Sequence, residues 1–340
     1  MQHTKKSILN SLKVRCLGAV TFALLAASPM ANAAEAANGK VDLLAGKRVM
    51  VLGDSITQDG SYVSFLEYFL QKAHPAKRFD IVSVGLASET TSGLSEPGHA
   101  GGAFPRPCVH ERLKRAIATV KPQVVIACYG MNDGIYLPLN EDRMNAFQAG
   151  VAKLAADCQA AGGQMILVTP PAFDITQVHG WKADPDYDRT LGKFAEWEVT
   201  HPPQGVIAVA DLHTAMGAAL IERQKTNPNF HFSPDGVHPG PLGHLLMAQA
   251  ILKGLEIPMP AGTAEELLAA ASADPMFALV CQHRETRSAG WLNYIGYTRD
   301  RKVDPGTGNV NAVETNARQI QQKIDALKMT GPVPAIKEGT

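Results

Sequence analysis

A short apolar run that ends in a glycine, an acid and a serine decides the fold of this chain: Arg48-Val-Met-Val-Leu-Gly-Asp-Ser-Ile-Thr57. The apolar part is typical of a strand that is buried on both faces of a parallel sheet. The glycine permits a tight turn, and Asp-Ser-x-Thr can cap a helix. The stretch therefore predicts a strand that turns directly into a helix.

Similar apolar runs recur along the chain and alternate with amphipathic stretches. Strands are predicted at Arg48–Leu52, Asp80–Val84, Val124–Cys128, Gln164–Val168 and Val206–Ala210. Helices are predicted near Ser61–Ala73, Val109–Val120, Asp142–Ala161, Asp186–Thr200, Thr214–Gln224 and Pro241–Leu255. This alternation predicts an α/β fold, a doubly wound sheet with helices on both faces. Ligands of such sheets bind beyond the carboxyl ends of the strands, so the residues that directly follow strands are the candidates for function.

The N-terminal residues have the pattern of a secretory signal. Basic residues from Lys5 to Arg15 precede an apolar stretch, Leu17 to Ala27, and the small residues Ala31-Asn32-Ala33 follow. The apolar stretch is too short to span a bilayer. We therefore expect residues 1–33 to be removed on export to the periplasm or the medium, with no membrane insertion afterwards. Residues 34–46 are predicted to be a mobile linker and 47–257 the sheet domain.

The chain changes character at Pro258, and residues 258–340 are predicted to form a helical extension. Helices are expected near Ala264–Ala273 and Met276–Tyr294, and a last one carries an apolar stripe of Val313, Ala317, Ile320, Ile324 and Leu327. The extension is interpreted as an appendage packed on the main domain, with a dimerisation helix as the alternative. Polar residues from Cys281 to Arg287, together with Trp291, suggest a charged solvent-facing surface. Alternatively, this helix could cover the crevice and bind substrate.

Composition limits the classes of function. The 32 basic residues balance the 32 acidic ones, so no net field favours nucleic acid or an anionic membrane. Hydrophobic residues make up 45% of the chain and charged residues 19%, as expected for a globular protein with a core. The cysteines that follow the signal match no zinc or redox spacing, and their pairing stays open: Cys108, Cys128, Cys158 and Cys281.

Two motifs supply the groups that serine-based chemistry needs. Ser55 follows the first strand, where its hydroxyl can reach the crevice. Asp235-Gly-Val-His238 precedes the last helix of the sheet domain. A serine needs a base to take its proton, and a carboxylate on the other imidazole nitrogen fixes the tautomer of that base. A helix cap at Ser55, or a metal site of His231, Asp235, His238 and His244, is the alternative.

Two further motifs follow the second and third strands. Gly85 comes after the second strand, where its amide could donate to a ligand. Asn132 lies in Tyr129-Gly-Met-Asn-Asp133, directly after the third strand, and its side chain could donate to an oxyanion. Turn formation explains each of them equally well when it is taken alone.

The joint order of these motifs over about residues 47–255 resembles the SGNH (GDSL-type) hydrolase superfamily. The resemblance implies a flavodoxin-like three-layer α/β/α fold with a five-stranded parallel sheet. It makes Ser55 the nucleophile, His238 the general base and Asp235 the residue that orients His238. The Ser55 amide, the Gly85 amide and the Asn132 side chain would form the oxyanion hole, with no cofactor or metal. Ile56 stands where the family name implies leucine.

The substrate is less well defined by the sequence. Residues 88–106 should lie at the rim of the crevice, and they are polar and small, including Glu89, His99 and Arg106. Such residues suit a substrate with many hydroxyl groups, and a solvated loop without a substrate role is the alternative. Tyr129, Tyr136, Trp181 and Trp197 could stack on sugars, although aromatic residues are commonly core. The resemblance to exported family members favours a carbohydrate O-acetylesterase. A lipolytic or aryl esterase, an acyltransferase and a polysaccharide-binding protein without activity are the alternatives.

Overall fold

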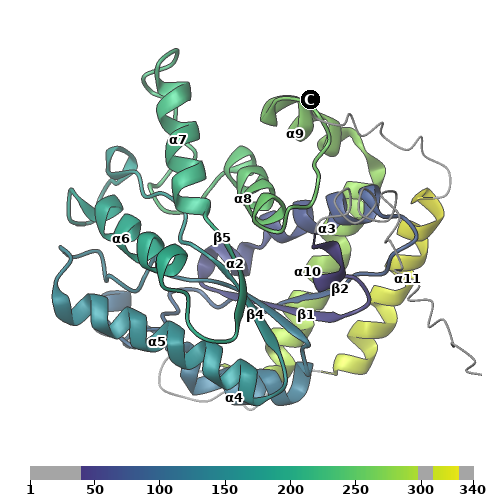
Figure 1. Ribbon diagram of the computed structural model, residues 1–340, viewed down its shortest axis with the longest axis horizontal. Helices are drawn as coiled ribbons and strands as arrows, with labels where there is room; N and C mark the ends of the chain where they lie inside the picture. Colours follow the sequence, from purple (N-terminus) through teal and green to yellow (C-terminus); the bar gives the residue numbers. More distant parts are fainter. Residues whose placement is uncertain (1–39, 298–308, 329–340) are drawn as a thin grey trace, which may run out of the picture. The chain divides into compact units, whose positions relative to one another are not determined.

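A five-stranded parallel sheet lies at the centre of the computed structural model, which describes residues 40–297 and 309–328 (Figure 1). The strand order is β2-β1-β3-β4-β5. The strands are β1 Arg48–Gly53, β2 Asp80–Ser83, β3 Val124–Cys128, β4 Gln164–Val168 and β5 Val206–Ala210. Each begins at its predicted residue and ends within one residue of its predicted end. The predicted fold class is therefore confirmed.

Helices cover both faces of this sheet (Figure 1). Helices α3 and α8 pack against each other, while α4, α5 and α6 follow one another on the opposite face. The helices are α2 Ser55–Asp59, α3 Ser61–Ala73, α4 Val109–Val120, α5 Glu141–Ala160, α6 Tyr187–Thr200, α7 Leu212–Gln224, α8 Pro241–Gly254, α9 Ala264–Ala273, α10 Pro275–Ile295 and α11 Val310–Lys328. The predicted helices agree within two residues; the short α2 was not predicted as a separate element.

The predicted mobile linker is wrong for its last residues, 40–46. Val41–Leu43 form a 3-10 helix, and the side chains of Val41 and Leu44 are fully buried. The Lys40 amide donates a hydrogen bond to the carbonyl of Leu255. Val41 and Leu44, with Leu43 and Ala45 packed beside them, thus attach this segment to the core. The predicted signal, residues 1–33, lies outside the described residues.

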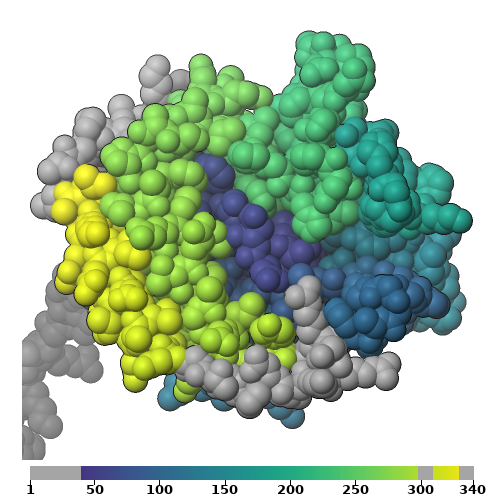
Figure 2. Space-filling model, turned by 180° about the vertical axis from the view of Figure 1, so that it is seen from behind, coloured from purple at the N-terminus to yellow at the C-terminus, as the bar shows by residue number. Residues whose placement is uncertain are grey.

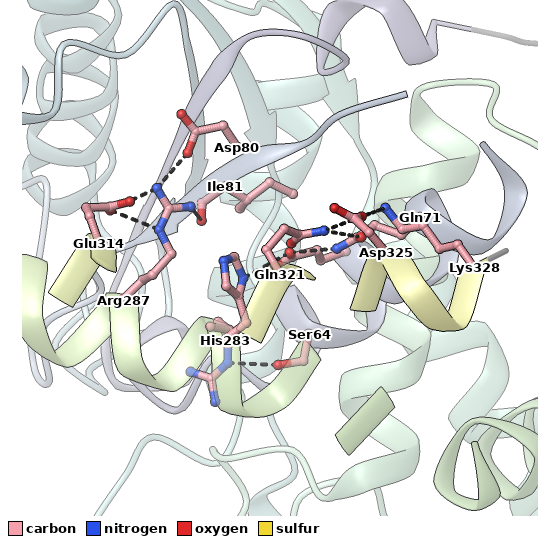
Figure 3. Close-up of polar contacts among 12 residues, drawn as sticks. Ser64, Gln71, Asp80, Ile81, His283, Arg287, Glu314, Gln321, Asp325 and Lys328 are labelled. Atoms are coloured by element: carbon pink, nitrogen blue, oxygen red, sulfur yellow. Dashed lines mark hydrogen bonds and ion pairs between the residues drawn. The ribbon is translucent and has the colours of Figure 1, made fainter. Parts of the chain in front are cut away.

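Helix α10 packs along the edge strand β2 and against α3, and α11 packs on α10. Figure 3 shows Arg287 of α10 between Asp80 and Glu314. Its guanidinium lies 2.6 Å from Asp80 Oδ1 and 3.0 Å from Glu314 Oε1, and it donates to the Ile81 carbonyl at 2.8 Å. The charged solvent face expected here is wrong for the residues that dock the helix: His283, Arg284, Arg287 and Trp291 are buried.

The apolar stripe of α11 is covered within the chain. Ala317, Ile320 and Ile324 are buried. At the crossing with α10, a Cβ on Gly290 would lie 2.3 Å from a methyl of Val313, so only glycine permits this approach. The appendage interpretation therefore describes α11 better than a dimerisation helix does.

The described cysteines Cys108, Cys128, Cys158 and Cys281 are free thiols. Within residues 40–297 and 309–328, none of the helices combines the length and apolarity needed to cross a membrane.

Because Arg287 joins two carboxylates and a carbonyl from a buried position, we expect Arg287→Met to lower the free energy of unfolding by about 3 kcal/mol. Methionine keeps most of the apolar contact and removes the charge. Chemical denaturation followed by circular dichroism measures the change. Arg189→Met, at an exposed position of α6, is the control and should stay within about 0.5 kcal/mol of the wild type. Equal losses in both variants would contradict a docking role for Arg287.

Candidate active site

Ser55 stands at the turn between β1 and α2, at the carboxyl edge of the sheet. The Asp54 side chain caps α2 by accepting a hydrogen bond from the Ile56 amide at 2.9 Å. Gly53 is required at the turn, because a Cβ there would lie 2.0 Å from the Thr57 hydroxyl. The local sequence therefore fixes where the Ser55 hydroxyl emerges.

Three side chains of the two predicted motifs form a continuous hydrogen-bonded chain. His238 Nε2 lies 2.8 Å from Ser55 Oγ, and His238 Nδ1 lies 2.7 Å from Asp235 Oδ2. The other oxygen of Asp235 accepts the amides of Val237 and His238 at 2.9 and 2.7 Å. Both oxygens of the Asp235 carboxylate thus accept hydrogen bonds from residues of its own loop. The imidazole of His238 is held between Asp235 and Ser55.

The two carboxyl groups near Ser55, those of Asp235 and Asp54, differ in pKa. Burial would raise the pKa of Asp235, but hydrogen bonds from the side chain and amide of His238 outweigh it and hold the pKa below its usual value. Asp54 is almost fully buried, and burial raises its pKa to about 7. Asp235 is therefore the anion available to an imidazolium.

Gly85 and Asn132 follow β2 and β3, which are the two neighbours of β1 in the sheet. Three strand ends that lie side by side thus bring Ser55, Gly85 and Asn132 to one edge. Gly85 packs on α2 so closely that a Cβ would lie 2.3 Å from the Gln58 amide. Among the described residues, the amides of Ser55 and Gly85 donate to no protein acceptor. Two donors are therefore left for a ligand.

The Asn132 side chain is held in one orientation by two donors. Arg106 Nη1 and the Tyr136 hydroxyl lie 2.9 and 3.1 Å from Asn132 Oδ1. A guanidinium has no acceptor, so the amide oxygen must face it and the amide nitrogen must point away. That nitrogen donates to the Glu89 carbonyl at 3.3 Å, which leaves its second hydrogen for a ligand.

Arg106 also anchors the segment of residues 88–106, which forms one side of the site as predicted. Its guanidinium makes a two-pronged ion pair with Glu96 at 2.7 and 2.6 Å. Asp133 ties down the start of the segment by accepting the amides of Thr91 and Ser92. The sequence did not predict the contact between Arg106 and Asn132. The two residues follow different strands, and no spacing in the sequence indicates that they meet.

Some residues that were expected at the rim or in sugar stacking are core residues. Glu89 is fully buried, where it pairs with Arg112 at 2.6 and 2.7 Å and accepts the Tyr129 hydroxyl. Trp197 is only partly buried and packs on Phe147. A surface role is therefore wrong for Glu89 and Tyr129, and stacking of a sugar on Trp197 stays a prediction.

A cavity of about 260 Å³ lies over the hydrogen-bonded chain. We call it the catalytic cavity; its wall comprises Ser55, Ser88, His99, Arg106, Asn132, Tyr136, Trp181, Asp235, Val237 and His238. Tyr136 and Trp181 meet edge to face with ring centres 4.8 Å apart, and Trp181 is 41% exposed. Tyr136 has a φ of 56°, a conformation that costs a non-glycine residue about 1–2 kcal/mol. The surroundings thus hold the backbone of Tyr136 in a strained conformation at the site.

The alternative metal site is not assembled. His244 Nε2 lies 3.2 Å from Asp59 Oδ1, while Asp235 and His238 face Ser55. Over the part of the chain that the structure describes, no three or more histidine, cysteine or acidic residues gather as metal ligands would.

Comparison with known proteins places this sheet and its loops among ester hydrolases. The model of the GDSL-like lipase/acylhydrolase family matches residues 51–246. No curated protein matches the sequence. Similar solved structures include a gut microbial diltiazem-metabolizing enzyme, with 20% identity over 62% of this chain and 47% of that one and a TM-score of 0.48. This chain thus spans about half the length of that enzyme.

Two other similar structures are shorter proteins. The acetylxylan esterase Axe2 from Geobacillus stearothermophilus is 20% identical over 63% of this chain and 95% of its own, with a TM-score of 0.43. A protein described as a GDSL-like lipase from Parabacteroides merdae is 18% identical over 62% and 97%, with a TM-score of 0.44. At these identities and scores, the structural likenesses carry no argument about substrate.

The raised pKa of Asp54 predicts how stability depends on pH at the turn before Ser55. Its pKa is about 7 in the folded chain, against an ordinary value of 3.8. Between these values the folded state binds more protons than the unfolded state, so the contribution of Asp54 to stability falls as pH rises and is constant above about pH 8. Asp54→Asn keeps an acceptor for the Ile56 amide and cannot ionise.

We therefore expect the stability of Asp54→Asn relative to the wild type to increase from about pH 4 to about pH 8 and then to level off. Urea denaturation at a series of pH values measures both proteins. A difference between them that does not change with pH would show that Asp54 does not titrate in this range.

Proposed function

Because this chain belongs to the GDSL-like lipase/acylhydrolase family of ester hydrolases, we propose that Ser55, His238 and Asp235 are its catalytic triad and that its substrate is an O-acetylated carbohydrate. The observation that carries the proposal is the contact of 2.8 Å between Ser55 Oγ and His238 Nε2, with Asp235 at 2.7 Å on the other imidazole nitrogen.

The geometry gives each member of the triad a step in ester cleavage. Ser55 Oγ attacks the ester carbonyl while His238 Nε2 takes the hydroxyl proton. Asp235 keeps the proton on Nδ1 and stabilises the imidazolium, and its lowered pKa keeps it ionised for this task. His238 then protonates the leaving alcohol of the sugar. In the second half of the cycle, His238 takes a proton from water, and the resulting attack releases acetate and restores Ser55.

The oxyanion of each tetrahedral intermediate needs donors that are already in place. The Ser55 amide, the Gly85 amide and Asn132 Nδ2 are the three that the ends of β1, β2 and β3 supply. Arg106 acts through Asn132, because its donors face the amide oxygen and so direct the nitrogen toward the cavity. Such donors stabilise the intermediate without reorganising during the reaction.

The lining of the catalytic cavity favours a small acyl group on a hydroxyl-rich alcohol. Ser88, His99 and Arg106 bring polar groups to the wall of the catalytic cavity. Val237 is the one aliphatic residue among the described residues that line it. A long acyl chain would displace water from this polar wall and offer it no hydrogen bonds in return. The exposed face of Trp181 next to Tyr136 offers a sugar ring a surface for stacking. A lipolytic or aryl esterase with the same triad remains the second candidate.

We propose as well that the protein is exported. The support is the N-terminal order of basic, apolar and small residues described above. Expression in a Gram-negative host should yield a periplasmic or secreted form whose intact mass begins after about Ala33. A form of full-length mass confined to the cytoplasm would contradict export.

Acetate release from a panel of acetylated polysaccharides tests reaction and substrate together. We expect the wild type to release acetate from at least one of them and Ser55→Ala to release none above background, because the nucleophile is missing. A comparison of p-nitrophenyl acetate with the octanoate ester separates the two candidates: preference for octanoate would favour the lipolytic enzyme. A Ser55→Ala variant as active as the wild type would remove Ser55 from the mechanism.

Asn132→Ala should lower kcat by about 100- to 1000-fold, as the loss of one oxyanion donor does in other hydrolases. Because some of the loss could come from misfolding, its denaturation curve is compared with that of the wild type. Normal stability with low kcat is the expected result, and unchanged kcat would remove Asn132 from the oxyanion hole.

A further inference from the structure

A second cavity, of about 340 Å³, lies between α2 and the C-terminal helix α10. Gln58 and Asp59 of α2 form one wall, and Arg284, Glu285 and Ser288 of α10 form the other. Figure 2 shows this face: purple surface from the start of the described chain lies in a hollow between the yellow-green surface of the C-terminal helices and the green surface that includes α7. The cavity is larger than the catalytic cavity, and the triad makes no use of it.

Two polar side chains of the second cavity have hydrogen-bonding groups without a partner in the described part of the chain. The Ser288 hydroxyl is buried and has no hydrogen-bond partner among the described residues. Arg284 is only 5% exposed; its Nε donates to Ser64 and its Nη2 faces Glu285, whereas its Nη1 has no acceptor among the described residues. Buried polar groups are normally paired, so the unpaired Nη1 of Arg284 indicates a ligand that supplies an acceptor. Ser288 Oγ reaches the same ligand after rotation of its side chain about the Cα–Cβ bond.

The mixture of donors and acceptors in the wall defines the class of ligand. Ser288 and Arg284 donate, while the carboxylates of Asp59 and Glu285 accept and keep side-chain exposures of 56% and 66%. One cation lies among two anions, so the wall does not favour an anionic ligand. An acyl chain would desolvate all of these groups without replacing their hydrogen bonds. A neutral ligand with several hydroxyl groups satisfies both kinds of partner.

The second cavity and the catalytic cavity flank the same turn of chain. Gln58 follows Ser55 by three positions of α2, about 4.5 Å along the helix axis. Gly85 lines the second cavity and Ser88 the catalytic one, and these two residues are three positions apart, at most about 10 Å of chain. The Ala87 amide donates to Gln58 Oε1 at 2.6 Å and so fixes the chain that separates the two cavities. The two cavities are thus close enough for linked sugar units.

We propose that the second cavity is a subsite for a further sugar unit of the carbohydrate whose ester is cleaved at Ser55. This inference rests on the proposed function and adds to it a role for the C-terminal extension: α10 supplies half of the subsite. A substrate of several sugar units occupies both cavities, whereas a single acetylated sugar or an aryl acetate occupies the catalytic cavity alone. The enzyme should therefore prefer oligomers to monomers.

The test is a pair of tryptophan variants on α10, because residues of this helix are too deeply packed for truncation to leave a folded domain. Ala289→Trp places a bulky side chain at an exposed position of the cavity wall. Gln282→Trp, exposed on the same helix outside the wall, is the matched control. Substrates are p-nitrophenyl acetate and the acetylated mono- and tetrasaccharide of the sugar that the polysaccharide panel selects.

We expect the wild type to cleave the tetrasaccharide with at least 10-fold higher kcat/KM than the monosaccharide. Ala289→Trp should abolish most of this advantage while its kinetics on p-nitrophenyl acetate stay within twofold of the wild type, and Gln282→Trp should behave as wild type throughout. Ser288→Ala, which removes one unpaired hydroxyl, should raise KM for the tetrasaccharide about threefold or more and leave the monosaccharide unaffected.

Two results would overturn the subsite. One is a wild type without preference for the tetrasaccharide. The other is Ala289→Trp that retains the full preference. An enzyme that is active on p-nitrophenyl acetate but on no member of the panel would instead refute the carbohydrate substrate, so the failure of the proposed function can be told from the failure of the subsite.

Discussion

A hydrogen bond of 2.8 Å joins Ser55 to His238 across 183 positions of the chain, and the proposed chemistry depends on both ends of it being fixed. At one end, β1 lies between β2 and β3, and Asp54 caps the short helix that begins at Ser55. At the other end, Asp235 holds the loop of His238 through two amides and the imidazole itself. Each end is rigid for local reasons, and the sheet brings the two together.

Ion pairs fix the chain in a similar way on the side of the site that faces Asn132. Glu89 and Arg112 form a fully buried ion pair, and Arg106 forms a second pair with the partly exposed Glu96. Removal of one partner from such a pair leaves an uncompensated charge, which is costly. These pairs therefore specify one position for the loop rather than simply adding stability, and through Arg106 that position fixes the orientation of Asn132.

The sequence was sufficient for the features that depend on local pattern. Apolar runs located all the strands, and a serine, a glycine and an asparagine after three of them located the edge of the sheet where the site lies. Pairings between distant residues could not be predicted, since neither Arg106 with Asn132 nor Arg287 with Asp80 has a spacing that reveals it. Helix α10 was misjudged for the same reason: its arginines are polar in the sequence, but they are buried. Arg284 donates to the Ser64 hydroxyl, and Arg287 donates to Asp80 and to the Ile81 carbonyl. The attachment of residues 40–46 was likewise not predicted, because its apolar residues are too few to form a periodic pattern.

Covalent labelling of the nucleophile tests the central claim most directly. A fluorophosphonate reagent reacts with a serine that a neighbouring imidazole activates, and the phosphonyl adduct stays on the oxygen that attacked. We predict one adduct per chain, located by fragmentation mass spectrometry at Ser55 and absent from His238→Ala. No adduct on the folded protein, or an adduct on a different residue, would contradict a nucleophile activated by His238.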